Sequence, residues 1–336
     1  LTNNMQNMIS FYNSEADRYQ EACRSLSKDD RPKFDKFISN DHSKISWSVN
    51  VKKDLSNFNK LSFNAHDLRD SSYRPYTRNF LYFNKNWNER RGQMSQIFPD
   101  DLVENRVVCV SSGAKSGFSA LIMNHIPSLD AVEKGQCFPL KLFEPKENKS
   151  EIKESNQQAS LFGDESKEES KNQKIEGDFI VKDGITDAGL EHFQKAYASE
   201  KINKEDIFYY IYGILHSEDY KTRFADNLSK ELPRIPTVKK ADDFWKFSKA
   251  GRDLADLHLN YETIEPYAVN FEGGNLAIKM LKKEDFRVEK MKFSKTGKET
   301  DKTKIIYNHK ITFAGIPLEA YDYVVNGKPA LEWVME

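Results

Sequence analysis

The stretch EDIFYYIYGILHS, residues 205–217, begins the most strongly patterned segment of the chain. Its apolar residues recur at helical spacing, which is typical of an amphipathic helix that buries one face. The members of this apolar stripe are Ile207, Tyr210, Ile211, Ile214 and Leu215. The pattern predicts a helix from Glu205 to Leu228. Pro233 and Pro236 would end it, because proline lacks the backbone donor that a helix needs.

Two further helices are predicted on either side of this segment. Thr186 can cap a helix that runs to about Tyr197, since a threonine side chain accepts a hydrogen bond from a free amide at a helix start. After the prolines, Asp242 or Asp243 begins a helix whose apolar side chains are Phe244, Trp245, Phe247, Leu254 and Leu257. Residues 186–260 are therefore predicted to form a helical block.

Strand patterns occur before and after the helical block. Residues 106–110 (RVVCV) form a β-branched run that is typical of a strand, and residues 111–117 (SSGAKSG) form a loop by composition. Residues 286–293 and 305–313 are two strand candidates. The polar link 294–304 joins them, with Gly297 as the turn former, which predicts a hairpin with a long loop.

The N-terminal part is predicted to begin with helices. Residues 1–27 have a rough helical spacing, and a second short helical piece follows from Asp30 to Ile38. Residues 44–95 are predicted to be irregular, with short strand signals such as NFLYF at 79–83. The predicted fold class is thus α+β, with N-terminal helices, a mixed β module, a supporting helical block and a C-terminal β-hairpin.

The composition changes abruptly at residues 146–176. This segment contains six lysines, seven glutamates and one aspartate, with few apolar residues. Such a composition cannot bury enough surface to offset the entropy of ordering the chain. We therefore expect a flexible insertion here.

Composition and the chain ends exclude several classes of protein. The net charge of the 336 residues is −1, so any basic surface must be local. No run approaches ~18 apolar residues and no secretory signal is present, so we expect a cytoplasmic protein without membrane contact. Cys23, Cys109 and Cys137 lack the paired spacing of metal sites and disulfide frameworks, which favours reduced, buried thiols and no metal. Because the first residue is Leu1, we expect a longer parent polypeptide.

The sequence lacks the common catalytic motifs. The nearest approach to a nucleotide-binding P-loop is at residues 114–116, where Ala114 and Cys109 stand in place of the two glycines. An amino-methyltransferase of DNA bases needs a Pro-Pro pair beside the residue that holds the flipped base, and none occurs. Neither a G-x-S-x-G elbow nor an H-E-x-x-H helix is found. We therefore expect neither a catalytic residue nor a bound cofactor in this chain.

Basic residues gather in two segments. Residues 44–95 contain ten Lys or Arg against four Asp or Glu, and residues 279–304 contain ten against five. Lys and Arg neutralise phosphates, and Asn, Gln and Arg can contact base edges. A solvated charged surface above an aromatic core explains the same composition, so composition alone leaves both interpretations open.

Several strings occur in an order that resembles a known family. They are ISW (45–47), YRPYTRNFLYF (73–83), NRVVCV (105–110), GQCFPL (135–140), DIFYYIYGILHS (206–217), RF (223–224), LPRIP (232–236) and ALEWV (330–334). Together they are similar to the C-terminal specificity region of Type ISP restriction-modification enzymes. The resemblance spans nearly the whole chain, with only the insertion outside it.

The resemblance implies a function. Type ISP enzymes are single polypeptides with a nuclease, a helicase-like ATPase, an adenine amino-methyltransferase and a target recognition domain. This chain would be a sequence-specific module for double-stranded DNA, with the upstream methyltransferase and helicase domains as its other partners. S-adenosylmethionine, ATP and Mg would bind the parent polypeptide.

The same resemblance divides the chain into four parts. Residues 1–43 would form a helical coupler, 44–145 a β-rich target recognition part, 146–176 the flexible insertion, and 177–336 the helical support with the C-terminal β part of the recognition domain. Two alternatives remain open. One is a protein-interaction scaffold with incidental basic patches, and the other is a stand-alone nuclease or methyltransferase fragment.

Candidate DNA contacts follow from side-chain chemistry, since the recognition loops of the family vary with the target. Small residues in 111–117 let the backbone approach phosphates, and Lys115 can neutralise one of them. Forked side chains in 85–93 can pair with base edges, and the 295–304 link is the next candidate. The full set is Arg74, Arg78, Lys85, Asn86, Arg90, Arg91, Gln93, Ser111, Ser112, Lys115, Ser116, Lys295 and Lys298.

Overall fold

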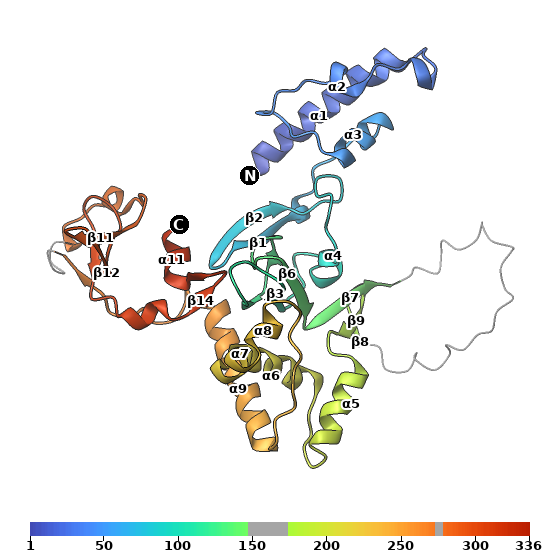
Figure 1. Cartoon of the computed structure of the whole chain (residues 1–336). Helices are drawn as coiled ribbons and strands as arrows, with labels where there is room; N and C mark the ends of the chain where they lie inside the picture. The colour runs from blue at the N-terminus through green and yellow to red at the C-terminus, as the bar shows by residue number, and fades with distance from the viewer. Residues whose placement is uncertain (147–173, 273–277) are drawn as a thin grey trace, which may run out of the picture.

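Helices and several small sheets make up the chain, which confirms the predicted α+β class (Figure 1). The computed structural model describes residues 1–146, 174–272 and 278–336. In Figure 1 the N-terminal helices lie above a central sheet, the C-terminal sheet lies to its left, and a helical block lies below it.

The N-terminal unit consists of α1 (Thr2–Cys23), α2 (Phe34–Phe37) and α3 (Val49–Ser56). Aromatic rings fill its interior, where the fully buried Tyr12 lies 6.1 Å from Trp47 and 6.2 Å from Trp87 between ring centroids. The helix predicted over 1–27 is confirmed. The helical piece predicted from Asp30 to Ile38 is shorter in the structure, where only the single turn of α2 is helical. Arg31, which precedes Pro32, has an extended backbone and cannot start the helix.

A two-stranded ribbon follows, formed by β1 (Leu68–Arg74) and β2 (Thr77–Tyr82), with β5 (Ile126–Pro127) paired in parallel to β1. The strand signal predicted at 79–83 is confirmed by β2, whereas the description of the rest of 44–95 as irregular is wrong, since it contains β1 and α3. The strand pattern was hidden because the buried positions of β1 carry the polar residues Arg69 and Ser71. The helix α3 was hidden because it is only eight residues long, with Ser48 as its cap. The short α4 (Met94–Ile97) ends this part.

The central sheet has the order β4-β3-β6, with β4 (Ala120–Met123), β3 (Val107–Ser111) and β6 (Gly135–Pro139) all antiparallel. Every residue of β3 is buried, which confirms the predicted strand. Its side chains alternate between two cores. Val108 and Val110 face the helical block, whereas Val107 and Cys109 face a second core that includes Ile97.

The helical block contains α5 (Asp187–Ala196), α6 (Lys204–His216), α7 (Glu218–Arg223), α8 (Ala225–Leu228) and α9 (Ala241–Leu259). The helix capped by Thr186 and the helix after the prolines are both confirmed. The single helix predicted over Glu205–Leu228 is wrong. Ser217 has an extended backbone and caps α7 by accepting a bond from the Tyr220 amide, so the chain turns long before Pro233.

Helices α6 and α9 touch through their backbones. A Cβ atom added at Gly251 would lie 1.9 Å from the Tyr209 carbonyl oxygen, and one added at Gly213 would lie 2.4 Å from the Phe247 carbonyl oxygen. Only glycine fits at these two positions.

An outer sheet has the order β7-β9-β8, formed by β7 (Lys141–Pro145), β9 (Phe179–Asp183) and β8 (Lys174–Glu176). Residues 147–173, most of the predicted flexible insertion, lie outside the described residues. At the two ends of the insertion, the Lys146 amide bonds to the Asp178 carbonyl, and β8 pairs with β9.

The C-terminal part contains a sheet of order β10-β13-β12-β11 and then a short ribbon with a final helix. Its elements are β10 (Asn270–Phe271), β11 (Lys292–Thr296), β12 (Glu299–Ile306), β13 (Thr312–Ala314), β14 (Val324–Val325), β15 (Lys328–Pro329) and α11 (Ala330–Met335). A C-terminal hairpin is present, as predicted, but its strands and its long loop are misplaced in the prediction, since of 286–293 and 305–313 only 292–293 and 305–306 lie in β11 and β12. Most of the link 294–304 is strand, and the turn is confined to Gly297 and Lys298 because Thr296 pairs with Glu299.

Candidate nucleic-acid interface

Two predicted contact residues, Arg74 and Arg78, lie on the β1–β2 ribbon and hold it to other elements. An Arg74 guanidinium nitrogen lies 3.0 Å from the Glu336 carboxylate. Arg78 donates to the Leu259 carbonyl at 2.7 Å and lies 3.5 Å from the Glu262 carboxylate. These guanidinium groups therefore have internal partners.

The segment 84–93 folds against α3. Asn86 donates to the Asp54 carboxylate at 2.6 Å, and the Arg91 guanidinium lies 5.5 Å from the centroid of the Phe83 ring. The exposed side chains of Lys85, Arg90 and Gln93 have no ion-pair or hydrogen-bond partner within the described residues. The predicted segment thus divides into anchoring side chains and side chains that remain available.

The loop 111–117 is held by a carboxylate from outside it. The Glu133 carboxylate accepts hydrogen bonds from the Lys115 amide at 3.1 Å, the Ser116 amide at 3.0 Å and the Ser116 hydroxyl at 2.5 Å. These hydrogen bonds lower the pKa of Glu133, and the bond from the Ser116 hydroxyl has the largest effect. The loop amides that were predicted to bind a phosphate therefore already donate hydrogen bonds to the Glu133 carboxylate.

The serines of this loop contribute to its internal structure. Ser111 is buried, and its hydroxyl donates to the Gly117 carbonyl and accepts from the Ser119 amide. Ser112 is half-buried, and the Ser116 hydroxyl donates its hydrogen bond to the Glu133 carboxylate. The Lys115 ammonium is exposed and has no side-chain partner among the residues described.

The tip of the β11–β12 hairpin presents free cations. Lys295 lies opposite Thr300 near the end of β11, and Lys298 lies in the turn after Gly297, whose φ is 65°. Both lysines are exposed and lack a side-chain partner in the described ranges. By contrast, Lys302 further down the hairpin pairs with Glu332 at 3.1 Å and lies over the Tyr321 ring.

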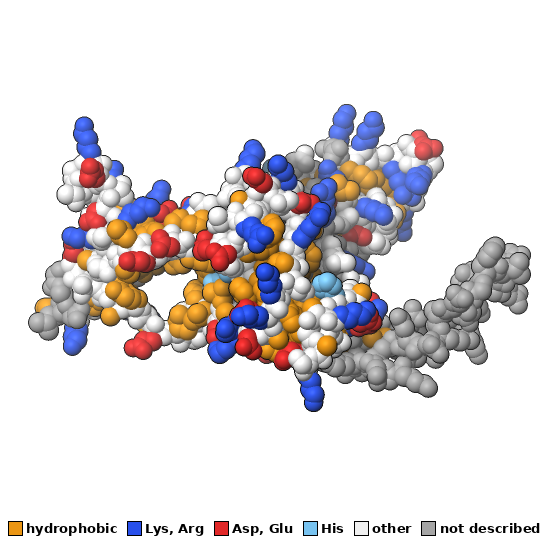
Figure 2. Space-filling model, turned by 60° about the horizontal axis from the view of Figure 1, so that its bottom comes forward, with side chains coloured by type: hydrophobic (Ala, Val, Ile, Leu, Met, Phe, Trp, Pro, Cys, Tyr) orange, Lys and Arg blue, Asp and Glu red, His pale blue; other side chains and the backbone are white. Residues whose placement is uncertain are grey.

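The structure does not bring the predicted residues into one patch. They occupy the ribbon, the segment against α3, the loop after β3 and the separate C-terminal sheet (Figure 1). Figure 2 shows Lys and Arg interspersed with Asp and Glu on the face that it presents. The residue that sequence reasoning missed is Glu133, because a bond between a carboxylate and amides 17 and 18 positions earlier leaves no local pattern.

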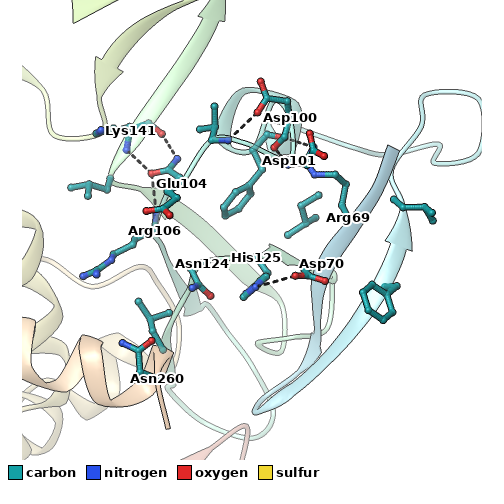
Figure 3. A pocket seen from close by; sticks show the side chains of 18 of the residues that line it. Arg69, Asp70, Asp100, Asp101, Glu104, Arg106, Asn124, His125, Lys141 and Asn260 are labelled. Atoms are coloured by element: carbon teal, nitrogen blue, oxygen red, sulfur yellow. Dashed lines mark hydrogen bonds and ion pairs between the residues drawn. The ribbon is translucent and has the colours of Figure 1, made fainter. Parts of the chain in front are cut away.

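A pocket of about 1170 Å³ lies between the β1–β2 ribbon, the segment 98–106 and α9 (Figure 3). Its acidic lining residues are Asp70, Asp100, Asp101, Glu104, Glu205 and Asp256, and its basic ones are Arg69, Arg106, Lys141 and Arg252. Arg106 lies 3.2 Å from Asp256, and Arg252 lies 2.8 Å from Glu205. His125, whose pKa is lowered mainly by burial, lies 3.6 Å from Asp70. Six carboxylates and four cationic side chains thus line the pocket, and Asp256 and Glu205 are paired with two of these cations.

Two further searches of the described residues gave negative results. No group of three or more His, Cys, Asp and Glu side chains is placed to hold a metal ion. No described helix combines the length and the apolar character needed to span a membrane.

Comparison with known proteins identifies one family. The chain matches the Type ISP C-terminal specificity domain over residues 1–336. No curated protein matches it significantly.

Three solved structures are similar to the whole chain. A nuclease-deletion mutant of the Type ISP restriction-modification enzyme LlaGI, in complex with a DNA substrate mimic, has 30% identity and a TM-score of 0.70 over 99% of this chain and 22% of its own. The ATP-dependent Type ISP restriction-modification enzyme LlaBIII bound to DNA has 26% identity and a TM-score of 0.72 over 99% of this chain and 18% of its own. A DrdV–DNA complex has 26% identity and a TM-score of 0.74 over 100% of this chain and 28% of its own. The chain thus spans less than a third of each relative.

Proposed function

The chain belongs to the Type ISP C-terminal specificity domain family, and we propose that it selects the double-stranded DNA sequence on which a single-chain restriction-modification enzyme acts. Adenine methylation with S-adenosylmethionine, ATP-dependent translocation and Mg-dependent cleavage belong, in this proposal, to upstream domains. The observation that carries the proposal is that three similar structures, each matching at least 99% of this chain, contain DNA or a DNA substrate mimic.

The DNA-facing groups in this proposal are those of the predicted residues whose exposed side chains no other described residue binds. They are Lys85, Arg90, Gln93, Lys115, Lys295 and Lys298. A cation already paired with a carboxylate contributes little net charge to a phosphate, so free cations are the better phosphate ligands. The four lysines would neutralise phosphates, whereas Arg90 and Gln93 have the forked donors and acceptors that contact base edges.

The remaining predicted residues stabilise the separate segments that carry these side chains. Arg74 and Arg78 fix the ribbon, Asn86 fixes its segment against α3, and Arg91 lies over the Phe83 ring. Ser111 and Ser116 shape the loop that carries Lys115, in which Ser112 is half-buried. Their substitution would therefore change DNA binding through the shape of the interface.

The experiment begins with the full-length enzyme and its target. Sequencing the methylated sites in DNA from cells that carry the enzyme identifies the recognition sequence. Binding is then measured on a duplex with this sequence and on a scrambled duplex, over a range of salt. Replacing Lys85, Lys115, Lys295 and Lys298 by Ala should lower the salt slope by up to about four on both duplexes, since each lost phosphate contact removes about one counterion.

A matched control uses four lysines that pair with carboxylates, Lys195, Lys221, Lys246 and Lys249. Their replacement by Ala should leave the salt slope unchanged. Equal slopes for the two quadruple variants would contradict the proposed surface. Loss of site-specific methylation without any change in binding would contradict the proposed function.

A further inference from the structure

Two of the three cysteines face each other inside the central sheet. Cys109 on β3 lies directly opposite Cys137 on β6, with 3.2 Å between the sulfur atoms. The third cysteine, Cys23, is buried in α1. Nothing in the spacing of the cysteines along the sequence indicated this pair, because a turn and β4 separate the two strands.

The backbone at this pair suits a covalent bond. The Leu140 amide donates to the Arg106 carbonyl at 2.8 Å. Arg106 and Leu140 are therefore a hydrogen-bonded pair of the β3–β6 ladder. Hydrogen-bonded and non-hydrogen-bonded pairs alternate, so Cys109 and Cys137, three positions further along, form a non-hydrogen-bonded pair. The Cα atoms of such pairs are about 4.5 Å apart, within the roughly 4.4–6.8 Å that a disulfide spans.

The two thiols differ in access and in acidity. Cys109 is 1% exposed, whereas Cys137 is only half-buried and lies on the edge strand of the sheet. The hydrogen bond between the two sulfur atoms lowers the pKa of Cys137 and raises the pKa of Cys109. A small oxidant from solvent therefore meets the more acidic thiol first, and thiolate character and exposure both favour oxidation.

We propose that Cys109 and Cys137 form an oxidation site in which a peroxide converts the two thiols into a cross-strand disulfide. The Cys137 sulfur attacks a peroxide oxygen, the O–O bond breaks, and Cys137 becomes a sulfenic acid while one water leaves. The Cys109 sulfur then attacks the Cys137 sulfur, the S–O bond breaks, and a second water leaves. Two thiols and one hydrogen peroxide thus give one disulfide and two waters, with two electrons passing from sulfur to the peroxide.

The position of this bond gives it a structural consequence. Ser111, at the start of the loop 111–117, pairs with Gly135 on the same two strands. Glu133, which holds the amides of that loop, lies just before β6. A disulfide would tie the edge strand to β3 beneath the loop and limit its fraying. This inference stands independently of DNA recognition.

The test uses peptide mapping of the full-length protein in its folded state. The protein is treated with hydrogen peroxide, its remaining thiols are alkylated under denaturing conditions, and trypsin then releases residues 107–115, 135–141 and 19–24, each with one cysteine. We expect 107–115 and 135–141 as one linked species, two hydrogen atoms lighter than their sum, that disappears on reduction. The Cys23 peptide should remain alkylated.

Two variants complete the test. Cys137→Ser should abolish the linked species and leave Cys109 as an alkylatable thiol. Cys109→Ser should stop the reaction at the Cys137 sulfenic acid, which dimedone traps. The proposal is overturned if the wild-type protein yields the two peptides separately, with Cys137 either alkylated or converted to sulfinic acid.

Discussion

The helix pair α6–α9 and the hairpin β11–β12 are stabilised by different means. The helix pair buries Tyr209, Tyr210, Tyr212 and Phe244 and brings two backbones into contact at Gly213 and Gly251. The hairpin buries only Ile305 within its strands, and Lys302 lies over the rings of Phe293 and Tyr321 at its root. Apolar packing thus fixes the first region, whereas backbone pairing and a tight turn fix the second.

The largest expected effect is the response of the helix pair to acid. His216 on α6 and His258 on α9 lie within a cluster of tyrosines, with the Tyr212 hydroxyl 2.6 Å from His258 Nδ1 and the Tyr323 hydroxyl 3.2 Å from His216 Nε2. Burial lowers the pKa of His216 to about 4. Burial and the charge of His216 lower the pKa of His258 to about 3.

The direction of the pH effect follows from these values. An unfolded histidine has a pKa of about 6.5, so below that pH the unfolded state binds protons that the folded state does not. The stabilisation is present above about pH 6.5 and is lost as the pH falls toward 4. At pH 5 the loss should be about 4 kcal/mol for the two groups together. Hydrogen exchange should show weaker protection of α6 and α9, with little change in β11 and β12.

A variant tests the assignment of this pH effect. His258→Asn retains a polar atom near the Tyr212 hydroxyl but cannot be protonated. The number of protons taken up on unfolding, which sets the slope of stability against pH, should therefore fall by one. Equal slopes for wild type and His258→Asn would show that other groups cause the acid response.

The second effect separates two glycines with different roles. Gly251→Ala places a Cβ against the Tyr209 carbonyl and the Gly213 amide, and should destabilise the helix pair by about 3 kcal/mol. Gly297→Ala meets no atom within 4 Å, and its cost comes only from a φ of 65°, which is about 1 kcal/mol for a residue with a side chain. Hydrogen exchange of α9 and of β12 measures both. Similar losses would show that the helix contact can adjust.

The difference between the helix pair and the hairpin explains which elements of the fold could be predicted from the sequence. The stripe on α6, the cap at Thr186 and the β-branched run of β3 have periodic or local signals that packing preserves, and all three were predicted. The prediction missed the strand residues 294–296 and 299–304 because Thr, Lys and Glu on a solvated sheet have no apolar alternation. The α7 start at Ser217 was missed because a single serine cap interrupts an otherwise continuous apolar stripe.

The candidate interface was predictable only in its chemistry. The sequence indicates which side chains can bind phosphates or bases, but not which of them already have internal partners. Arg78 and Lys298 illustrate this limit. They were selected by the same reasoning, yet Arg78 bonds to α9 and to Glu262, whereas Lys298 has no side-chain partner in the described ranges.

The third effect uses that contrast directly. Arg78→Ala should lower stability by about 1 kcal/mol, since the Leu259 carbonyl loses its donor and the ribbon loses one of its contacts with α9. Lys298→Ala should leave stability unchanged. Thermal denaturation of both variants provides the measurement. A destabilised Lys298→Ala together with an unchanged Arg78→Ala would reverse the roles assigned to them.

The smallest expected effect concerns the loop 111–117, which resembles the hairpin turn in composition but is held from outside like an element of the core. Glu133→Gln replaces one carboxylate oxygen by an amide group, so at most one acceptor remains for the Lys115 and Ser116 amides and the Ser116 hydroxyl. Faster exchange of the Lys115 and Ser116 amides is the expected outcome, with global stability unchanged because Glu133 lies at the surface. Glu144→Gln, which removes an exposed pair with Lys182 at 2.8 Å, is the matched control and should not affect these amides. Unaltered exchange in Glu133→Gln would mean that the turn itself orders the loop. The loop would then resemble the turn of the β11–β12 hairpin, whose own backbone conformation keeps it ordered.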